Sequence, residues 1–267
     1  MTIIHSPPFV VCEITNIVWC GQTFVALFGF DYEMMYLCKA KMCFSMNREE
    51  FEKVSAELKR VASDMPPEWG AVQNDELDDQ VDVFAFSALA DLDREMDGLC
   101  LCEKDRTYVR RRWYIAHCAR CDEYIFCLND RVIHNSDIFD KSWDIRFEGV
   151  CQVAFDVKSS RIPKALIKNA AYAISNPRLM IGSFYRLQSK ERRYSINNRL
   201  FVVHHSFVAQ WRELILRSAW ELKNVVFEEY CRRVLEGKKA FFDYEGCVCD
   251  VIVIQEDAEG NISYVIY

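Results

Sequence analysis

Three close pairs of cysteines have spacings that could support metal or redox chemistry. They are Cys100/Cys102, Cys118/Cys121 and Cys247/Cys249. Two cysteines separated by one residue on a strand face the same side of that strand. A Cys-x-x-Cys turn also directs two sulfurs at one centre, and a tetrahedral zinc ion requires two such pairs. The sequence therefore offers one four-cysteine zinc hypothesis, built on Cys100, Cys102, Cys118 and Cys121, with His117, Cys127 and His134 nearby as further ligands.

Two other interpretations of these cysteines stay open. The chain has 13 cysteines, an odd number, and no secretory signal opens it, which is typical of reduced thiols in the cytoplasm. Most of them are then expected to be small core residues. A redox pair would need a helix N-terminus to lower the thiol pKa, whereas both flanks of Cys118 and Cys121 look extended. We favour buried thiols, no resident cofactor, and a structural zinc as the alternative.

A second candidate lies in two carboxylates and a lysine. Asp144 precedes a strand-like segment, and Asp156 and Lys158 stand one residue apart at its end. This arrangement resembles the active site of metal-dependent nucleases of the restriction-enzyme type. The resemblance covers about residues 84–187. It implies that the two carboxylates hold Mg²⁺, that the lysine orients or activates the attacking water, and that Glu95 is an extra ligand.

Two basic clusters beside aromatic residues could bind an acidic partner. They comprise Arg110, Arg111, Arg112 and Trp113 in one segment, and Arg192 and Arg193 in another. Arginine next to aromatic residues is typical of interfaces with proteins and of contacts with single-stranded nucleic acid. The alternative interpretation is a solvated strand edge and a solvated loop.

Several classes of function find no support in the sequence. The net charge is −7, which argues against a protein that binds nucleic acid nonspecifically. The chain has no Gly-x-Ser-x-Gly elbow, Walker loop or Gly-x-Gly-x-x-Gly, and it has only 9 glycines. No run of eighteen apolar residues predicts a membrane span. Adjacent His204 and His205 would face opposite sides of a strand, so they are not expected to share a metal ion.

Hydrophobic periodicity predicts the elements that must position these residues. We expect helices over 47–65, 86–97, 163–175 and 206–236, and strands over 9–20, 23–30, 33–44, 106–118, 123–128, 145–157 and 179–187, followed by a hairpin over 239–267. The helix over 206–236 has the widest apolar face, and it could also pair with a second copy of the chain.

Strands that are grouped, rather than alternating strictly with helices, predict an α+β fold. We expect a mainly antiparallel sheet with about four helices, one of them long and amphipathic near the C-terminus. Residues 1–65 would form a small meander-plus-helix module and residues 83–267 the main domain, with the acidic segment 66–82 as a loop or linker.

These observations predict a non-enzymatic cytoplasmic protein that binds another macromolecule, as a regulator, adaptor or inhibitor. A protein partner is favoured, with nucleic acid as an alternative partner. A Mg²⁺-dependent nuclease centred on Asp144, Asp156 and Lys158 is the second hypothesis, and a zinc-stabilised module that binds nucleic acid is the third. The identity of the partner, the oligomeric state and the pathway are not encoded in any motif of the sequence.

Overall fold

The chain of 267 residues divides into two compact units, Met1–Cys43 and Phe44–Tyr267. The computed structural model describes residues 17–20, 23–26, 46–65, 75–137, 140, 142–149, 152–189 and 197–267. In the first unit, β1 (Ile17–Cys20) pairs antiparallel with β2 (Thr23–Ala26), which confirms the first hairpin of the predicted meander. The third predicted strand of the meander, residues 33–44, lies outside the described residues.

A seven-stranded mixed sheet organises the larger unit. Its strands are β3 (Val132–His134), β4 (Ile145–Phe147), β5 (Val153–Arg161), β6 (Arg199–Ser206), β7 (Phe242–Tyr244), β8 (Cys247–Glu256) and β9 (Ile262–Ile266). The order is β3-β4-β5-β6-β8-β7, and β9 also pairs with β8. Strands β5, β6 and β8 run parallel, whereas the other pairs are antiparallel. The prediction of a mainly antiparallel sheet is therefore wrong.

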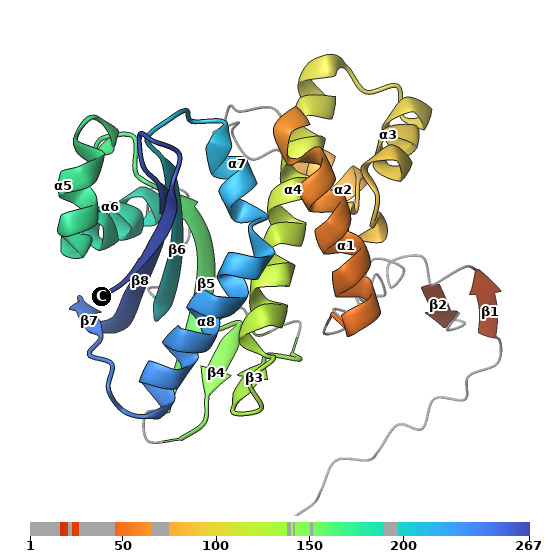
Figure 1. The fold of residues 1–267 in the computed structure, drawn as a ribbon. Coiled ribbons are helices and arrows are strands. Elements are labelled where there is room, and N and C mark those ends of the chain that lie inside the picture. Colours follow the sequence, from red (N-terminus) through yellow and green to blue (C-terminus); the bar gives the residue numbers. More distant parts are fainter. Residues whose placement is uncertain are drawn as a thin grey trace, which may run out of the picture. The chain divides into compact units, whose positions relative to one another are not determined.

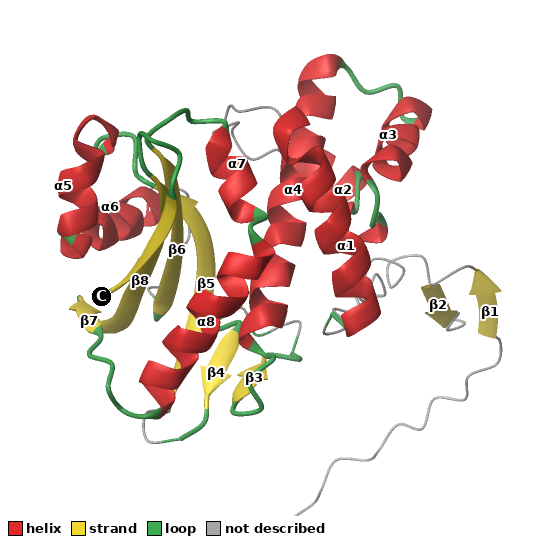
Figure 2. Ribbon diagram, in the orientation of Figure 1, coloured by secondary structure: helices red, strands yellow, loops and turns green. Residues whose placement is uncertain are grey.

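The larger unit has eight α-helices in the described part of the chain, twice the number predicted. They are α1 (Arg48–Val61), α2 (Asp75–Gln80), α3 (Leu89–Gly98), α4 (Glu103–Phe126), α5 (Ala170–Ser175), α6 (Pro177–Ser189), α7 (Arg212–Arg217) and α8 (Trp220–Leu235). Helices α5 and α6 cover one face of the sheet, and α4, α7 and α8 lie on the other (Figure 1; Figure 2 separates helices from strands by colour). A parallel strand pair needs such crossover connections, and the additional helices supply them.

The two faces of the sheet bury separate apolar clusters. On β6, Leu200 and Val202 pack into the cluster under α4 and α8, whereas Phe201 and Val203 pack into the cluster under α5 and α6. This alternation follows from the two-residue period of a strand. Because both faces are covered, all eight residues of β6 are buried, and its apolar part, Leu200 to Val203, is a continuous run rather than an alternating one.

Helix α4 replaces two strands that the sequence predicted over 106–118 and 123–128. Aromatic and β-branched residues favoured strands there. The buried positions nevertheless recur at helical spacing, at Val109, Trp113, His117, Cys121 and Ile125. The helix packs on several neighbours at once, and its buried stripe includes polar side chains. Its apolar periodicity is therefore weak, and the tertiary contacts override the local preference.

Three further predicted elements differ from the structure in type or in extent. The predicted strand over 179–187 is part of α6, which begins at Pro177, a residue favoured in the first helical turn. The predicted helix over 206–236 is divided: Ser206 ends β6, and α7 stops at Ser218 before α8 starts at Trp220. The predicted helix over 163–175 forms only in its last part, as α5.

Helix α1 is confirmed together with its N-cap. The backbone N–H of Glu50 donates to the Asn47 side chain at 2.9 Å. The helix packs on α4, where Phe51 stacks on Tyr124 with ring centroids 4.5 Å apart, and Arg120 forms an ion pair with Glu50 at 2.8 Å. Helix α1 thus lies within the larger compact unit, Phe44–Tyr267.

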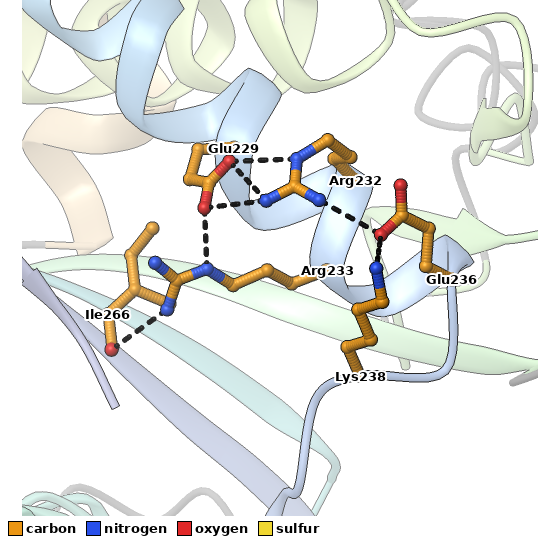
Figure 3. A network of polar contacts seen from close by, with 6 residues as sticks. All are labelled: Glu229, Arg232, Arg233, Glu236, Lys238 and Ile266. Carbon is orange, nitrogen blue, oxygen red and sulfur yellow. Dashed lines mark hydrogen bonds and ion pairs between the residues drawn. The ribbon is translucent and has the colours of Figure 1, made fainter.

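The predicted helix over 86–97 is confirmed as α3, and the C-terminal hairpin is confirmed as β8 and β9. Within the acidic segment 66–82, residues 75–80 form α2, and residues 66–74 lie outside the described residues. The exposed side of α8 carries a network of ion pairs in which Arg233 binds Glu229 and also donates to the carbonyl oxygen of Ile266 on β9 (Figure 3). This contact joins α8 to the last strand.

Candidate active site

The hairpin of β4 and β5 places Asp144 beside Asp156. Ile145 stands opposite Phe155 in the antiparallel ladder, and the backbone N–H of Asp144 donates to the Phe155 carbonyl at 2.8 Å. The Asp144 side chain then turns onto β5, where its Oδ2 accepts the backbone N–H of Val157 at 2.7 Å. Two carboxylates that lie twelve residues apart in the sequence thus meet at one corner of the sheet.

Asp156 is the most strongly engaged residue of this corner. It is 4% exposed, and its Oδ2 accepts from Arg199 Nε at 3.1 Å. Its Oδ1 forms an ion pair with Lys158, which stands two residues along β5 and hence on the same face. Arg199 is the residue directly opposite Asp156 on β6. The structure therefore brings together the three residues of the nuclease hypothesis, Asp144, Asp156 and Lys158.

A third acidic residue, Glu123, reaches the same corner from α4. Its Oε2 lies 3.0 Å from Nε2 of His134, the last residue of β3. Burial, together with the negative charges of Glu123 and Asp156, raises the pKa of Asp144 to about 7, although Lys158 opposes the shift. The hydrogen bond to Glu123 raises the pKa of His134. The charged neighbours of Asp144 thus include two other carboxylates and one ammonium.

The second oxygen of each aspartate is of the type that a hard cation binds. The scaffold takes one oxygen of each aspartate: the N–H of Val157 binds Oδ2 of Asp144, and Arg199 binds Oδ2 of Asp156. Carboxylate oxygens are the protein ligands that Mg²⁺ prefers. Among the described residues, no three side chains of Asp, Glu, His or Cys stand close enough together to hold a metal ion as they are placed. A cation at this corner would have to replace the ammonium of Lys158 at Oδ1 of Asp156.

An open groove of about 410 Å³ lies along the same hairpin. It is lined by Arg146, Phe147, Glu148 and Gln152. Arg146 follows Asp144 by two residues, and its guanidinium lies 5.1 Å from the centroid of the Trp143 ring. The groove lies at the turn end of the hairpin, whose other end carries Asp144 and Asp156.

Glu95, the extra ligand of the hypothesis, does not join this corner. It is exposed on α3, which is tied to the first half of α4 by ion pairs of Arg106 with Asp97 and of Arg110 with Asp93. Glu123 follows Arg110 by thirteen residues, which is roughly 20 Å along the helix axis. The acidic residue that does reach the corner is therefore Glu123, on a different helix.

The four cysteines of the zinc hypothesis do not converge. Cys100 and Cys102 are exposed just before α4, whereas Cys118 and Cys121 are buried within it. The sixteen residues from Cys102 to Cys118 span roughly 24 Å of helix. Burial raises the pKa of the Cys118 thiol to about 12, which favours the neutral thiol. Cys118 and Cys121 therefore serve as core residues in this arrangement.

Two arginines of the first basic cluster form ion pairs with neighbouring segments of the fold. Arg110 pairs with Asp93 at 2.7 Å, and Arg112 pairs with Asp78 at 3.0 Å. Trp113 is fully buried and donates its indole N–H to the Phe86 carbonyl at 2.7 Å. Arg111 is half-buried on the same helix. These side chains fasten α4 to the segments before it, while Arg192 and Arg193 lie outside the described residues.

Sequence reasoning missed Glu123 and Arg199 for identifiable reasons. Glu123 lay in a segment interpreted as a strand, so no helix was available to carry it towards β4. Arg199 precedes the apolar run "LFVV", and only the parallel register of β5 and β6 places it opposite Asp156. The signal in the sequence is a basic residue directly before an apolar run, because a cation in that position is buried only when it has a partner.

In the described part of the chain, no helix combines the length and the apolar character needed to cross a membrane. No family model matches the sequence, and no curated protein or solved structure is detectably similar to the chain.

Proposed function

We propose that the protein is a metal-dependent phosphodiesterase acting on nucleic acid, with its active site at the corner formed by Asp144, Asp156 and Lys158. One observation carries the proposal. Two carboxylates from adjacent strands are each fixed through Oδ2, with a lysine on the same strand face as the second carboxylate. These are two of the carboxylates and the lysine that the resemblance to metal-dependent nucleases implied. The proposal concerns this local group of side chains, so the net negative charge of the chain does not argue against it.

Each side chain has a separate task in this proposal. Asp144 and Asp156 would hold the cation through oxygen, with Glu123 as a further acceptor at the edge of the site. A bound Mg²⁺ supplies stabilisation of the negative charge that develops on a phosphodiester under attack. Once released from Asp156, Lys158 would donate to the attacking water and orient it towards phosphorus. We expect the substrate to approach from the side of the hairpin where Arg146 lines the open groove.

The test is cleavage of labelled single-stranded and double-stranded DNA and RNA by the full chain, with Mg²⁺, Mn²⁺, Ca²⁺ or EDTA. We expect cleavage with Mg²⁺ or Mn²⁺ and none with EDTA. Asp156→Asn and Lys158→Met should each lower the rate by at least about a hundredfold, because each removes a group that acts on the reacting atoms. Glu95→Gln is the matched control and should cleave like the wild type, since Glu95 is exposed on α3. Full activity in Asp156→Asn would refute the proposal.

A second candidate function, binding of another protein, is favoured by a different observation. The turn after β6 exposes three large apolar side chains, Phe207, Val208 and Trp211, each at least 40% exposed. Such a group on a surface is typical of a contact site for another protein. A pull-down with the wild type and with Trp211→Ala tests this candidate. Equal recovery of every partner by the two proteins would remove this turn as the contact site.

A further inference from the structure

Arg199 and Lys158 both neutralise Asp156, but they are held very differently. Arg199 is 4% exposed and stands directly opposite Asp156 in the parallel ladder, with Nε 3.1 Å from Oδ2. The side chain of Lys158 is 31% exposed, and it reaches Oδ1 at the end of a flexible stem. One contact is therefore part of the sheet, whereas the other can be exchanged.

The guanidinium of Arg199 is itself fixed by aromatic packing. It lies 5.3 Å from the centroid of the Tyr185 ring on α6. Tyr185 in turn stacks on Tyr244 with centroids 4.7 Å apart, and its hydroxyl donates to the Asn197 carbonyl at 2.8 Å. A planar guanidinium suits this combination of ring contact and directed hydrogen bond better than an ammonium does.

The backbone supports the same arrangement. The N–H of Asp156 donates to the Asn198 carbonyl at 2.9 Å, and the Asn198 side chain accepts from the N–H of Val248 at 2.9 Å. Strands β5, β6 and β8 are thus joined at the level of Asp156. Neither the main chain nor Oδ2 of this residue can turn without breaking these contacts.

We propose that Arg199 is the positioning residue of the site: it holds Asp156 through Oδ2, so that Oδ1 alone is presented to a divalent cation. This inference rests on the proposed function. Arg199 touches neither the substrate nor the cation, and it acts through the orientation of one carboxylate. Loss of such an outer contact typically lowers metal affinity or activity by about 10- to 100-fold. Removing Arg199 also removes a positive charge that repels the bound ion, which offsets the poorer orientation of Asp156. We therefore expect the metal affinity to stay nearly unchanged and the turnover number to fall.

The experiment compares Arg199→Gln and Arg199→Lys with the wild type in two assays. Calorimetry measures the Kd for Mn²⁺ without substrate, and initial rates on a single-stranded oligonucleotide give kcat and KM. We expect Kd in Arg199→Gln to be no more than about twofold weaker than in the wild type, because losing a charge that repels the ion offsets the poorer orientation of Asp156. In Arg199→Lys, which keeps the charge, Kd should also stay within about twofold of the wild type. We expect kcat to fall by at least about tenfold in Arg199→Gln and by about threefold in Arg199→Lys, with little change in KM.

The matched control is Arg212→Gln, which removes another arginine–carboxylate pair, with Glu256, at the far end of the parallel strands. Its kcat and Kd should equal those of the wild type. Mn²⁺ binding without cleavage by the wild type would refute the proposed function alone. Wild-type kcat in Arg199→Gln, or Mn²⁺ binding lost together with kcat, would overturn the positioning role. If Arg199→Gln does not fold, unchanged kcat in Arg199→Lys overturns it.

Discussion

Replacing Lys223 by methionine should destabilise the larger unit severely, although it preserves the length of the side chain. Lys223 on α8 and Asp122 on α4 are both fully buried, and Nζ lies 2.6 Å from Oδ1. The variant would leave the Asp122 carboxylate in the core without its counter-ion. Oδ2 of Asp122 already has no hydrogen-bond partner in the described structure. Breaking a buried pair by removing one partner costs about 3–5 kcal/mol.

A double replacement should restore most of that loss. Asp122→Leu with Lys223→Met removes both buried charges, and replacing a buried ion pair by apolar residues is often close to neutral, within about 1 kcal/mol of the wild type. Urea unfolding of the four proteins at pH 7, followed by circular dichroism and tryptophan fluorescence, completes the double-mutant cycle. We expect a coupling free energy of roughly 3 kcal/mol or more.

The same cycle has a pH dependence with a definite sign. Burial raises the pKa of Asp122. Without Lys223 the folded state binds a proton that the unfolded state releases, so Lys223→Met should regain stability as the pH falls towards the unfolded pKa of about 3.9. A loss below about 1 kcal/mol in Lys223→Met, or a double variant that loses the sum of both single effects, would refute the account of this pair. Because Glu123 follows Asp122, the pair also fixes how α4 presents Glu123 to β3.

Two further predictions concern buried side chains of α4. Burial lowers the pKa of His117 to about 4, so the unfolded state binds the extra proton between pH 6.5 and 4, and stability should fall over that window as the solution is acidified. His117→Gln, which does not titrate, should remove about 3 kcal/mol of that fall in urea unfolding at each pH, and an unchanged acid limb would contradict the assignment. In thiol labelling followed by mass spectrometry, Cys100 and Cys102 should react in the native protein, whereas Cys118 and Cys121 should react only after unfolding. Rapid native labelling of Cys118 would show that α4 is not packed as described.

Local features could be predicted from the sequence more reliably than the pairing of distant strands. The cap of α1 at Asn47 and the hairpin of β8 and β9 depend on neighbouring residues, and both were predicted correctly. The parallel register that joins Asp156 to Arg199 brings together residues forty-three positions apart, and no local pattern encodes it. The prediction of a mainly antiparallel sheet therefore failed where crossover helices intervene.

Helix α4 shows a second limit of sequence reasoning. Its buried stripe contains His117, Cys121 and Asp122, so a scale that counts polar residues as exposed hides its helical period. Asp122 can be buried because it pairs with Lys223, which lies more than a hundred positions later in the sequence. The candidate site was partly predictable for the opposite reason: Asp144, Asp156 and Lys158 lie within one hairpin. Glu123 required the correct assignment of α4.

The most direct test of the central claim is divalent-metal-dependent hydrolysis of nucleic acid by the purified full chain, compared with Asp144→Asn and Asp156→Asn. The account predicts that the wild type cleaves with Mg²⁺ or Mn²⁺, that chelation abolishes cleavage, and that both variants stay folded yet inactive. A wild type that cleaves no DNA or RNA with any of these ions, or two variants that cleave as fast as the wild type, would contradict it.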